Sequence, residues 1–332
     1  MTEYPEQAAP LPARAARRTT KVAIVGAGTV GATLAYAALM RGVARTVALY
    51  DVNKDKVEAE ALDIGHGIQF MPMGEVIGSD DIAVCEDADV VVVTAGAKQR
   101  PGQSRLDLAE GTISLMRSIM PGLVETAPDA IFIMVTNPVD IATYAALKHA
   151  GLPANQLFGS GTVLDSSRLR YLVAQHCGVA VQNVHAYIAG EHGDSEIPLW
   201  SSASIGSIPL LDWPGLGDGR GKMDKAARER IAFEVVNSAD KIIAGKGATN
   251  YAVALAGSRI IEAVLGDENS VLPVSSLLTD YHGISNVCLS VPAVVGRNGV
   301  VDQLEVPMSP DELAGLRRSA EALTAVAKRF GL

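Results

Sequence analysis

KVAIVGAGTVG, residues 21–31, begins with five residues of a buried-strand pattern and continues into three glycines spaced two and three residues apart. A helical pattern follows to residue 41, and a second apolar run, TVALYD, occupies residues 46–51. Short runs rich in β-branched residues are typical of strands covered on both faces, and glycine permits the tight turn between such a strand and a helix. Residues 21–51 are therefore predicted to form a β-α-β unit.

The same alternation continues along the first half of the chain. A helical pattern covers residues 54–67, and the runs VVVVTAG (Val90–Gly96) and AIFIMVTN (Ala130–Asn137) are continuously apolar. Such runs indicate central strands of a parallel sheet with helices on both faces. The prediction is an α/β fold, with a doubly wound Rossmann-type parallel sheet over residues 20–162.

The pattern changes after about Gly151 and predicts a second domain of α+β type over residues 163–332. A strand-like segment covers residues 183–193, and the glycine-rich stretch at residues 212–222 indicates a surface loop. The predicted helices of this half cover Leu164–Cys177, Lys222–Ala244, Thr249–Leu265 and Ser309–Phe330. Residues 1–19, rich in Ala, Pro and Arg, are expected to form a flexible tail.

Composition excludes several classes of function. A formal net charge of −9 argues against a nucleic-acid or acidic-membrane binder, which needs clustered positive charge. Three widely spaced cysteines suggest neither a disulfide framework nor a zinc site. Arg17-Arg18 before an apolar run imitates an export signal, but the patterned glycines favour a strand and a helix. We expect a cytoplasmic protein without a membrane span and without a metal.

The glycines indicate a nucleotide site. Gly26, Gly28 and Gly31 would serve a tight turn, close approach of a pyrophosphate and close helix packing, respectively. The pattern alone is weak, but Asp51 ends the next strand, 20 residues after Gly31, where a carboxylate can accept both ribose hydroxyls. Because its charge would repel a 2′-phosphate, the sequence predicts NAD over NADP as the cofactor.

A second set of polar residues indicates the chemistry. His192 lies in the polar, glycine-flanked turn EHGDSE and not on an apolar helical face, which favours a functional histidine. A lone histidine is more often structural, so the neighbouring motifs must decide. Asp165 and Arg168 are three residues apart and share one helix face. Reduction of a 2-keto acid needs a carboxylate clamp, a proton donor and positive charge near the carbonyl oxygen. Arg168 could clamp the carboxylate, and His192 could be the acid/base oriented by Asp165.

The motifs GAGTVG, VTNPVD, LDSSRLR, GEHGDSE and KGATNYA, in this order, resemble the lactate dehydrogenase branch of the lactate/malate dehydrogenase family. The resemblance spans Lys21 to the C-terminus. It implies that Arg105 polarises the carbonyl group, that Asn137 hydrogen-bonds the substrate and that Thr249 borders the pocket for its methyl group. It also implies a homotetramer, and contacts to NAD from Val30, Lys56, Gly96, Ala97, Ser118, Val135, Asn137 and Ser160.

One loop position indicates which substrate pair is used. In this family an arginine there pairs with the second carboxylate of malate or oxaloacetate, and a glutamine accompanies lactate and pyruvate; this chain has Gln99. Beside a neutral glutamine, the second carboxylate of oxaloacetate would be buried without a partner, at a cost of several kcal/mol in binding free energy. Pyruvate and lactate lack this carboxylate and are therefore favoured. Arg100 lies next to Gln99, so a one-residue shift of the loop would present an arginine. The alternatives are a malate dehydrogenase and a catalytically idle homologue.

Arg170 and His185 resemble the pair that binds fructose 1,6-bisphosphate across a subunit interface in the regulated bacterial members of the family. At about 100° per residue, Arg170 points to nearly the opposite side of its helix from Arg168. Two subunits would gather four potential positive charges about a two-fold axis, which suits a bisphosphate. The resemblance therefore implies allosteric activation, although both residues could also be ordinary surface groups.

Overall fold

The computed structural model describes residues 19–96 and 105–332, and the side chains of residues 105–107 are not described. The tail of residues 1–18 and the predicted site residues Ala97 and Gln99 thus lie outside the described residues, together with Arg100.

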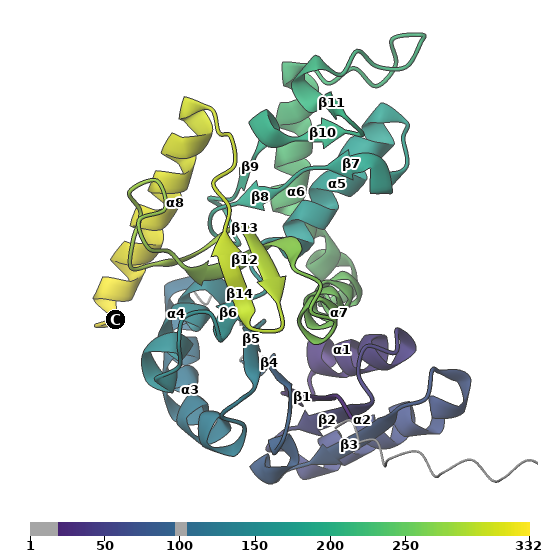
Figure 1. The fold of residues 1–332 in the computed structure, drawn as a ribbon, viewed down its shortest axis with the longest axis vertical. Coiled ribbons are helices and arrows are strands. Elements are labelled where there is room, and N and C mark those ends of the chain that lie inside the picture. Colours follow the sequence, from purple (N-terminus) through teal and green to yellow (C-terminus); the bar gives the residue numbers. More distant parts are fainter. Residues whose placement is uncertain (1–18, 97–104) are drawn as a thin grey trace, which may run out of the picture.

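A nine-stranded sheet forms the centre of the molecule (Figure 1). Its parallel part has the order β3-β2-β1-β4-β5-β6. These strands are β1 (Lys21–Val25), β2 (Thr46–Tyr50), β3 (Glu75–Ser79), β4 (Val90–Val93), β5 (Ile131–Met134) and β6 (Leu157–Gly159). The direction of winding changes between β1 and β4, and in such sheets ligands bind beyond the carboxyl ends of the strands at this point.

Helices cover both faces of this sheet, as predicted (Figure 1). One face packs on α1 (Thr29–Met40), α2 (Lys54–His66) and α7 (Tyr251–Leu265), through side chains such as Leu34 and Ile260. The other packs on α3 (Arg105–Thr126), α4 (Val139–Ala150) and α8 (Pro310–Arg329), through Met116 and Leu316. The four residues of β4 are fully buried, in agreement with a central strand.

The sheet continues into the second half of the chain. Strands β12 (Ser270–Leu277), β13 (Cys288–Gly296) and β14 (Gly299–Gln303) are antiparallel, and β12 pairs with β6 through Ser275 and Gly159. Gly161 has φ +51°, and a Cβ there would lie 2.5 Å from the backbone nitrogen of Ser275. The two halves therefore share one sheet, a continuity that the sequence pattern did not predict.

A smaller body forms from α5 (Val163–Cys177), α6 (Lys225–Lys246) and several short strands. The strands are β7 (Val184–His185), β8 (Ile188–Ala189), β9 (Ile197–Pro198), β10 (Ser204–Ile205) and β11 (Ile208–Pro209), in the orders β11-β10-β7 and β8-β9. Single helical turns occupy Ile68–Phe70, Ile82–Cys85, Val181–Asn183, Trp200–Ser202 and Leu210–Asp212.

The predicted helices are confirmed to within a few residues at their ends. Helix α6 begins at Lys225 and not at Lys222, because the Asp224 side chain accepts a hydrogen bond from the Ala227 amide at 2.8 Å and caps the helix. The loop at residues 212–222 is largely exposed, as expected. Within the described residues, no helix has the length and apolar character needed to cross a membrane.

Candidate active site

The turn between β1 and α1 shows why its glycines are needed. Gly26 has φ +103°, and a Cβ there would lie 2.8 Å from the Ala95 nitrogen. A Cβ on Gly31 would collide with the Gly26 carbonyl and lie 2.8 Å from Thr94 Oγ1, whereas one on Gly28 would meet nothing within 4 Å. Gly26 and Gly31 thus permit the turn and the helix packing, and Gly28 leaves open space where a pyrophosphate could approach the backbone.

Asp51 lies beside this turn. One carboxylate oxygen accepts the Ala27 amide at 2.8 Å, and the other accepts the Asn53 amide at 3.0 Å. The carboxylate is thereby fixed at the carboxyl end of β2, at the position expected for contact with a ribose. The turn and this carboxylate together fit an NAD molecule.

The other residues predicted to contact NAD have clear places in the fold. Gly96, Val135 and Ser160 follow β4, β5 and β6 at the carboxyl edge of the sheet. Val30 and Lys56 lie in the first turns of α1 and α2. Ser118 differs, because it lies exposed within α3, well beyond the start of that helix.

A cavity of about 290 Å³ brings together residues from both halves of the chain. Asn137, directly after β5, lines it together with Asp165 and Arg168 from α5 and with His192 from the loop after β8. Apolar residues of α3, α6 and α8 form part of the wall, and four further acidic residues also line it: Glu191, Asp194, Glu196 and Asp240. A few convergent polar groups in such a hollow are typical of a small-molecule site.

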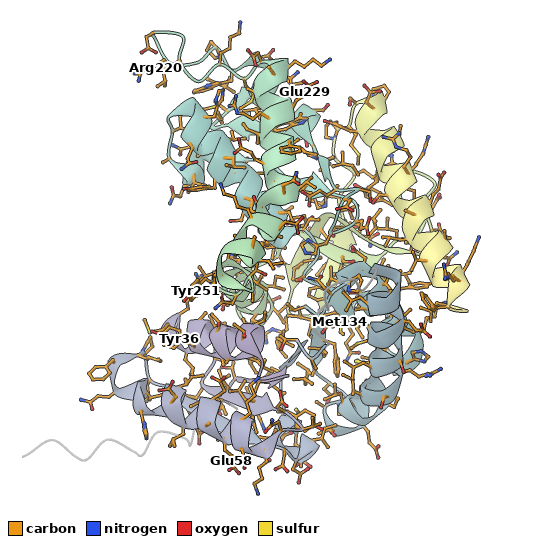
Figure 2. The ribbon with its side chains drawn as sticks, turned by 180° about the vertical axis from the view of Figure 1, so that it is seen from behind. Tyr36, Glu58, Met134, Arg220, Glu229 and Tyr251 are labelled. Atoms are coloured by element: carbon orange, nitrogen blue, oxygen red, sulfur yellow. The ribbon has the colours of Figure 1, made fainter. Side chains whose placement is uncertain are left out.

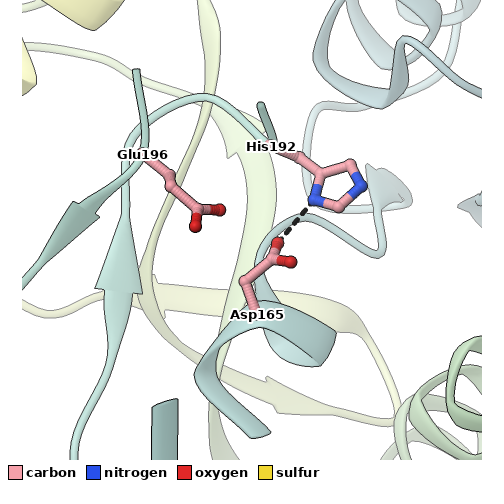
Figure 3. A group of neighbouring side chains, drawn as sticks. All are labelled: Asp165, His192 and Glu196. Carbon is pink, nitrogen blue, oxygen red and sulfur yellow. Dashed lines mark hydrogen bonds and ion pairs between the residues drawn. The ribbon is translucent and has the colours of Figure 1, made fainter. Parts of the chain in front are cut away.

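Asp165 connects the histidine and the arginine. His192 Nδ1 lies 2.5 Å from one Asp165 oxygen (Figure 3). Arg168 Nη1 donates to the other oxygen at 2.6 Å. The Asp165 side chain is 1% exposed. Burial favours its protonated form, but the charges of His192 and Arg168 outweigh this and hold the Asp165 pKa below its ordinary value. Because an ionised carboxylate only accepts hydrogen bonds, Nδ1 of His192 must be the donor.

The environment of His192 suits a residue that transfers a proton. Burial lowers the pKa of His192, but the charge of Asp165, its hydrogen bond and the charges of Asp140 and Glu196 together raise that pKa to about 9. The imidazolium therefore dominates near neutral pH. Nε2 lies on the side of the ring away from Asp165 (Figure 3), where it can exchange a proton with a bound substrate.

Asp140, which the sequence analysis missed, holds the backbone of the histidine. Its carboxylate accepts the His192 amide at 2.8 Å and the Ser275 hydroxyl at 2.6 Å, and its side chain is buried. Burial raises its pKa to about 6, against the opposing effect of both hydrogen bonds. Its position in the first turn of α4, three residues after Asn137, was the available signal.

Glu196 was also missed as a site residue, although it belongs to the same motif as His192. One ligand atom from each of Glu196, Asp165 and His192 lies within 4.8 Å of the others. This is a donor set that could hold a metal, but Asp165 already accepts hydrogen bonds from Arg168 and His192. The absence of a metal stays a prediction.

Thr249 and Arg105 are two further residues predicted to contact the substrate. Thr249 lines a neighbouring hollow of about 450 Å³ between α5, α6 and α7, which shares Arg168 with the main cavity. Arg105 is the first residue of α3, and its side chain is not described.

Arg170 and His185 lie at one place on the surface. Arg170 Nε donates to the Ala186 carbonyl at 2.9 Å, and its guanidinium lies 4.9 Å from the centre of the Tyr187 ring. His185, the residue before Ala186, is exposed. Arg170 therefore contacts the two residues that follow His185 in the chain, and a shared site of Arg170 and His185 stays a prediction.

Comparison with known proteins agrees with this geometry. Residues 20–159 match the NAD-binding domain of lactate/malate dehydrogenase, and residues 162–330 match its α/β C-terminal domain. The L-lactate dehydrogenase of Bifidobacterium animalis subsp. lactis is 60% identical, over 95% of this chain and 98% of its own length. That of a Thermoanaerobacter species is 48% identical, over 94% and 99%.

A solved structure is similar throughout. The minor L-lactate dehydrogenase of Enterococcus mundtii, in a ligand-bound form, superposes with a TM-score of 0.90 at 38% identity, covering 95% of this chain and 99% of that one. Fold, site geometry and both domain matches agree, and the chain belongs to the lactate/malate dehydrogenase family.

Proposed function

We infer that the chain is an NAD-dependent L-lactate dehydrogenase, which interconverts pyruvate and (S)-lactate. The observation that carries the inference is the arrangement of His192, Asp165 and Arg168 around one cavity with Asn137. The names of the relatives support the lactate assignment.

NADH supplies the hydride when it is bound in the cradle formed by the glycine turn and Asp51. Arg168 binds the pyruvate carboxylate, and Asn137 hydrogen-bonds the substrate. His192 gives its Nε2 proton to the carbonyl oxygen as the alcohol forms, while Asp165 stabilises the imidazolium beforehand and fixes the ring orientation. Arg105 polarises the carbonyl group, and Thr249 borders the space for the methyl group. In the reverse direction His192 takes the hydroxyl proton of lactate.

The test is product analysis. The full chain incubated with NADH and pyruvate should form (S)-lactate in equal amount to the NADH consumed. Formation of (R)-lactate would contradict the proposed stereochemistry. No consumption of NADH above a pyruvate-free control would contradict the proposal and would favour an idle homologue.

Activation by fructose 1,6-bisphosphate is a second part of the proposal. The proximity of Arg170 and exposed His185 supports it, because a two-fold axis nearby would gather both pairs. A tenfold fall in the pyruvate KM would need about 1.4 kcal/mol of coupling.

Pyruvate saturation curves with and without the bisphosphate test this part, in the wild type and in Arg170→Gln. We expect the bisphosphate to move the wild-type curve but not the Arg170→Gln curve. Superimposable wild-type curves at about pH 6 and about pH 8 would refute the regulatory site.

We further propose a homotetramer in the cytoplasm. Large apolar side chains are exposed along α1, α2 and α7, including Tyr36, Leu62 and Tyr251, and Figure 2 shows Tyr36 and Tyr251 at the same side of the molecule. Exposed apolar groups of this kind are typical of subunit interfaces. The three cysteines carry free thiols, which suits a reducing compartment. Light scattering after gel filtration should give four times the chain mass, and a monomeric mass would contradict the assembly.

A further inference from the structure

Glu196 has no role in the mechanism above, and yet its side chain reaches the acid/base pair. It projects from the loop after His192, just before β9, toward the pair formed by Asp165 and His192 (Figure 3). The nearest ligand atoms of the three side chains lie within 4.8 Å of one another. The dashed bond in Figure 3 joins only His192 and Asp165, so Glu196 acts across space and not by a hydrogen bond to either.

The environment of Glu196 does not suit a carboxylate ion. Its Oε1 atom is buried without a hydrogen-bond partner among the described residues. This oxygen loses hydration and gains no donor, which disfavours the carboxylate ion, although the half-buried side chain also lines the cavity. The Asp165 carboxylate is also close, and two neighbouring carboxylates rarely ionise together.

Charged groups of several elements face this carboxyl group. Burial and the charge of Asp165 favour the neutral form of Glu196, as does Asp194, whereas His192 and Arg168 favour the ionised form; together they raise the Glu196 pKa to about 8. The other ionisable groups around the same cavity are Glu191 in the His192 loop and Asp240 on α6, with Asp140 on α4 in contact with His192.

We propose that Glu196 is a positioning residue for the proton of His192: it is a neutral acid at neutral pH and becomes a second negative charge beside the imidazole in alkaline solution. The proposal rests on the proposed function, because it concerns the same histidine. The negative charge of an ionised Glu196 keeps His192 protonated at pH values at which the imidazole would otherwise lose its proton. The chain thereby extends pyruvate reduction to higher pH without a further group that touches the substrate.

The sign of the effect follows from the two charges. Below the pKa of Glu196 the side chain is neutral, so its replacement by glutamine changes no charge and His192 is unaffected. Above that pKa the ionised wild-type residue attracts the imidazolium, and glutamine removes the attraction. With the two charged groups within 4.8 Å, such a pair shifts a titration by roughly one pH unit or more, depending on how strongly water in the cavity screens the charges.

The pH profile of Glu196→Gln tests the proposal. With saturating NADH, the kcat/KM of the variant for pyruvate at about pH 6 should lie within about twofold of the wild-type value. The alkaline decline of kcat/KM should begin about one pH unit lower than in wild type. At about pH 9 this shift corresponds to a loss of about fivefold in kcat/KM. Glu196→Asp should retain most of the wild-type alkaline range. Glu229→Gln, which removes an exposed carboxylate from α6, is the matched control and should shift nothing.

Binding of oxamate, an unreactive analogue of pyruvate, gives a readout without turnover. Its dissociation constant with the NADH complex, followed by NADH fluorescence, should show the same alkaline shift in Glu196→Gln. An unchanged alkaline limb would overturn the proposal, and so would an equal loss at every pH, which would indicate a structural or substrate-contact role. If wild type neither reduces pyruvate nor binds oxamate, the proposed function itself fails.

A measurement on the wild type keeps the proposal falsifiable if the glutamine variant does not fold. Infrared difference spectra between about pH 7 and pH 9 should show the loss of a carboxylic-acid C=O band, because a protonated carboxyl group ionises in this range. A difference spectrum without such a band would refute a neutral Glu196 at neutral pH.

Discussion

At the scale of single residues, the site depends on one buried carboxylate. Asp165 uses one oxygen for His192 and the other for Arg168, so a single side chain holds both the proposed proton donor and the proposed carboxylate clamp. The sequence predicted these three residues, because a polar turn and an i, i+3 pair are local patterns. Asp140 and Glu196 were missed because their roles depend on contacts between distant or non-helical segments.

Replacement of the acid/base residue should separate chemistry from cofactor binding. His192→Ala should lower turnover of pyruvate by about 10² to 10⁴-fold, because general acid catalysis contributes this much. NADH affinity, measured by fluorescence titration, should stay near that of wild type, since the glycine turn and Asp51 lie on other strands. Turnover close to wild type would remove His192 from the mechanism.

At the scale of elements, two glycines of the turn from β1 to α1 have different functions: Gly31 permits the packing of the fold, and Gly28 leaves space for the cofactor. Gly31→Ala should destabilise the fold by about 1–3 kcal/mol, because the new Cβ meets the Gly26 carbonyl. Gly28→Ala should unfold at nearly the wild-type temperature, because its Cβ meets no protein atom within 4 Å.

For NADH binding we expect the opposite: Gly28→Ala should have a large effect, although it hardly changes stability. Gly28→Ala should weaken NADH by about tenfold, which corresponds to about 1.4 kcal/mol, because the methyl group fills the space near the pyrophosphate. Thermal unfolding and NADH titration of both variants check this pair of effects. Equal NADH affinity in Gly28→Ala and wild type would place the pyrophosphate elsewhere.

Long helices were predicted well from the sequence, whereas short strands were not. Long helices such as α5 and α8 were predicted within a residue or two. Gly178, in a left-handed conformation, ends α5, and the capping box of Ser309 and Glu312 begins α8. The predicted strand-like segment of residues 183–193 is divided into β7 and β8, which join different small sheets. Two-residue strands carry no period of their own, and their pairing is set by contacts with distant residues.

At the scale of the whole molecule, the sheet that joins both halves also links stability to the site. Asp140 on α4 bonds to Ser275 on β12 and to the His192 backbone, and Asp165 lies buried between the same layers. The charges of the site therefore contribute to unfolding as well as to catalysis. The sequence could not predict this link, because the pairing of β6 with β12 joins residues more than a hundred positions apart.

The pH dependence of Asp165→Asn measures this contribution. The Asp165 pKa is lowered by folding, so its stabilisation is present above its ordinary value of 3.8 and is lost as pH falls through the lower folded value. The His192 pKa is raised to about 9, so its stabilisation is complete below its ordinary value of 6.5 and is lost as pH rises through about 9. The difference between wild type and variant should thus be largest between about pH 4 and pH 6.5.

Between about pH 4 and pH 6.5, the free energy of unfolding of Asp165→Asn should be roughly 3–5 kcal/mol lower than that of wild type. The substitution leaves the charged partners of a buried ion pair without their counter-charge. Urea unfolding at one fixed protein concentration over this pH series is the measurement, with Asp63→Asn on the exposed side of α2 as control. A difference that does not vary with pH would show that packing, and not charge, accounts for the loss.

A preference for pyruvate over oxaloacetate distinguishes a lactate dehydrogenase from a malate dehydrogenase. The ratio of kcat/KM for these two acids, in wild type and in Gln99→Arg, measures this preference. We predict that wild type prefers pyruvate by orders of magnitude, because a neutral amide leaves the second carboxylate unpaired, and that the arginine variant shifts the ratio toward oxaloacetate. A wild-type preference for oxaloacetate would contradict the account, and an unchanged ratio in the variant would transfer the discriminating role to Arg100.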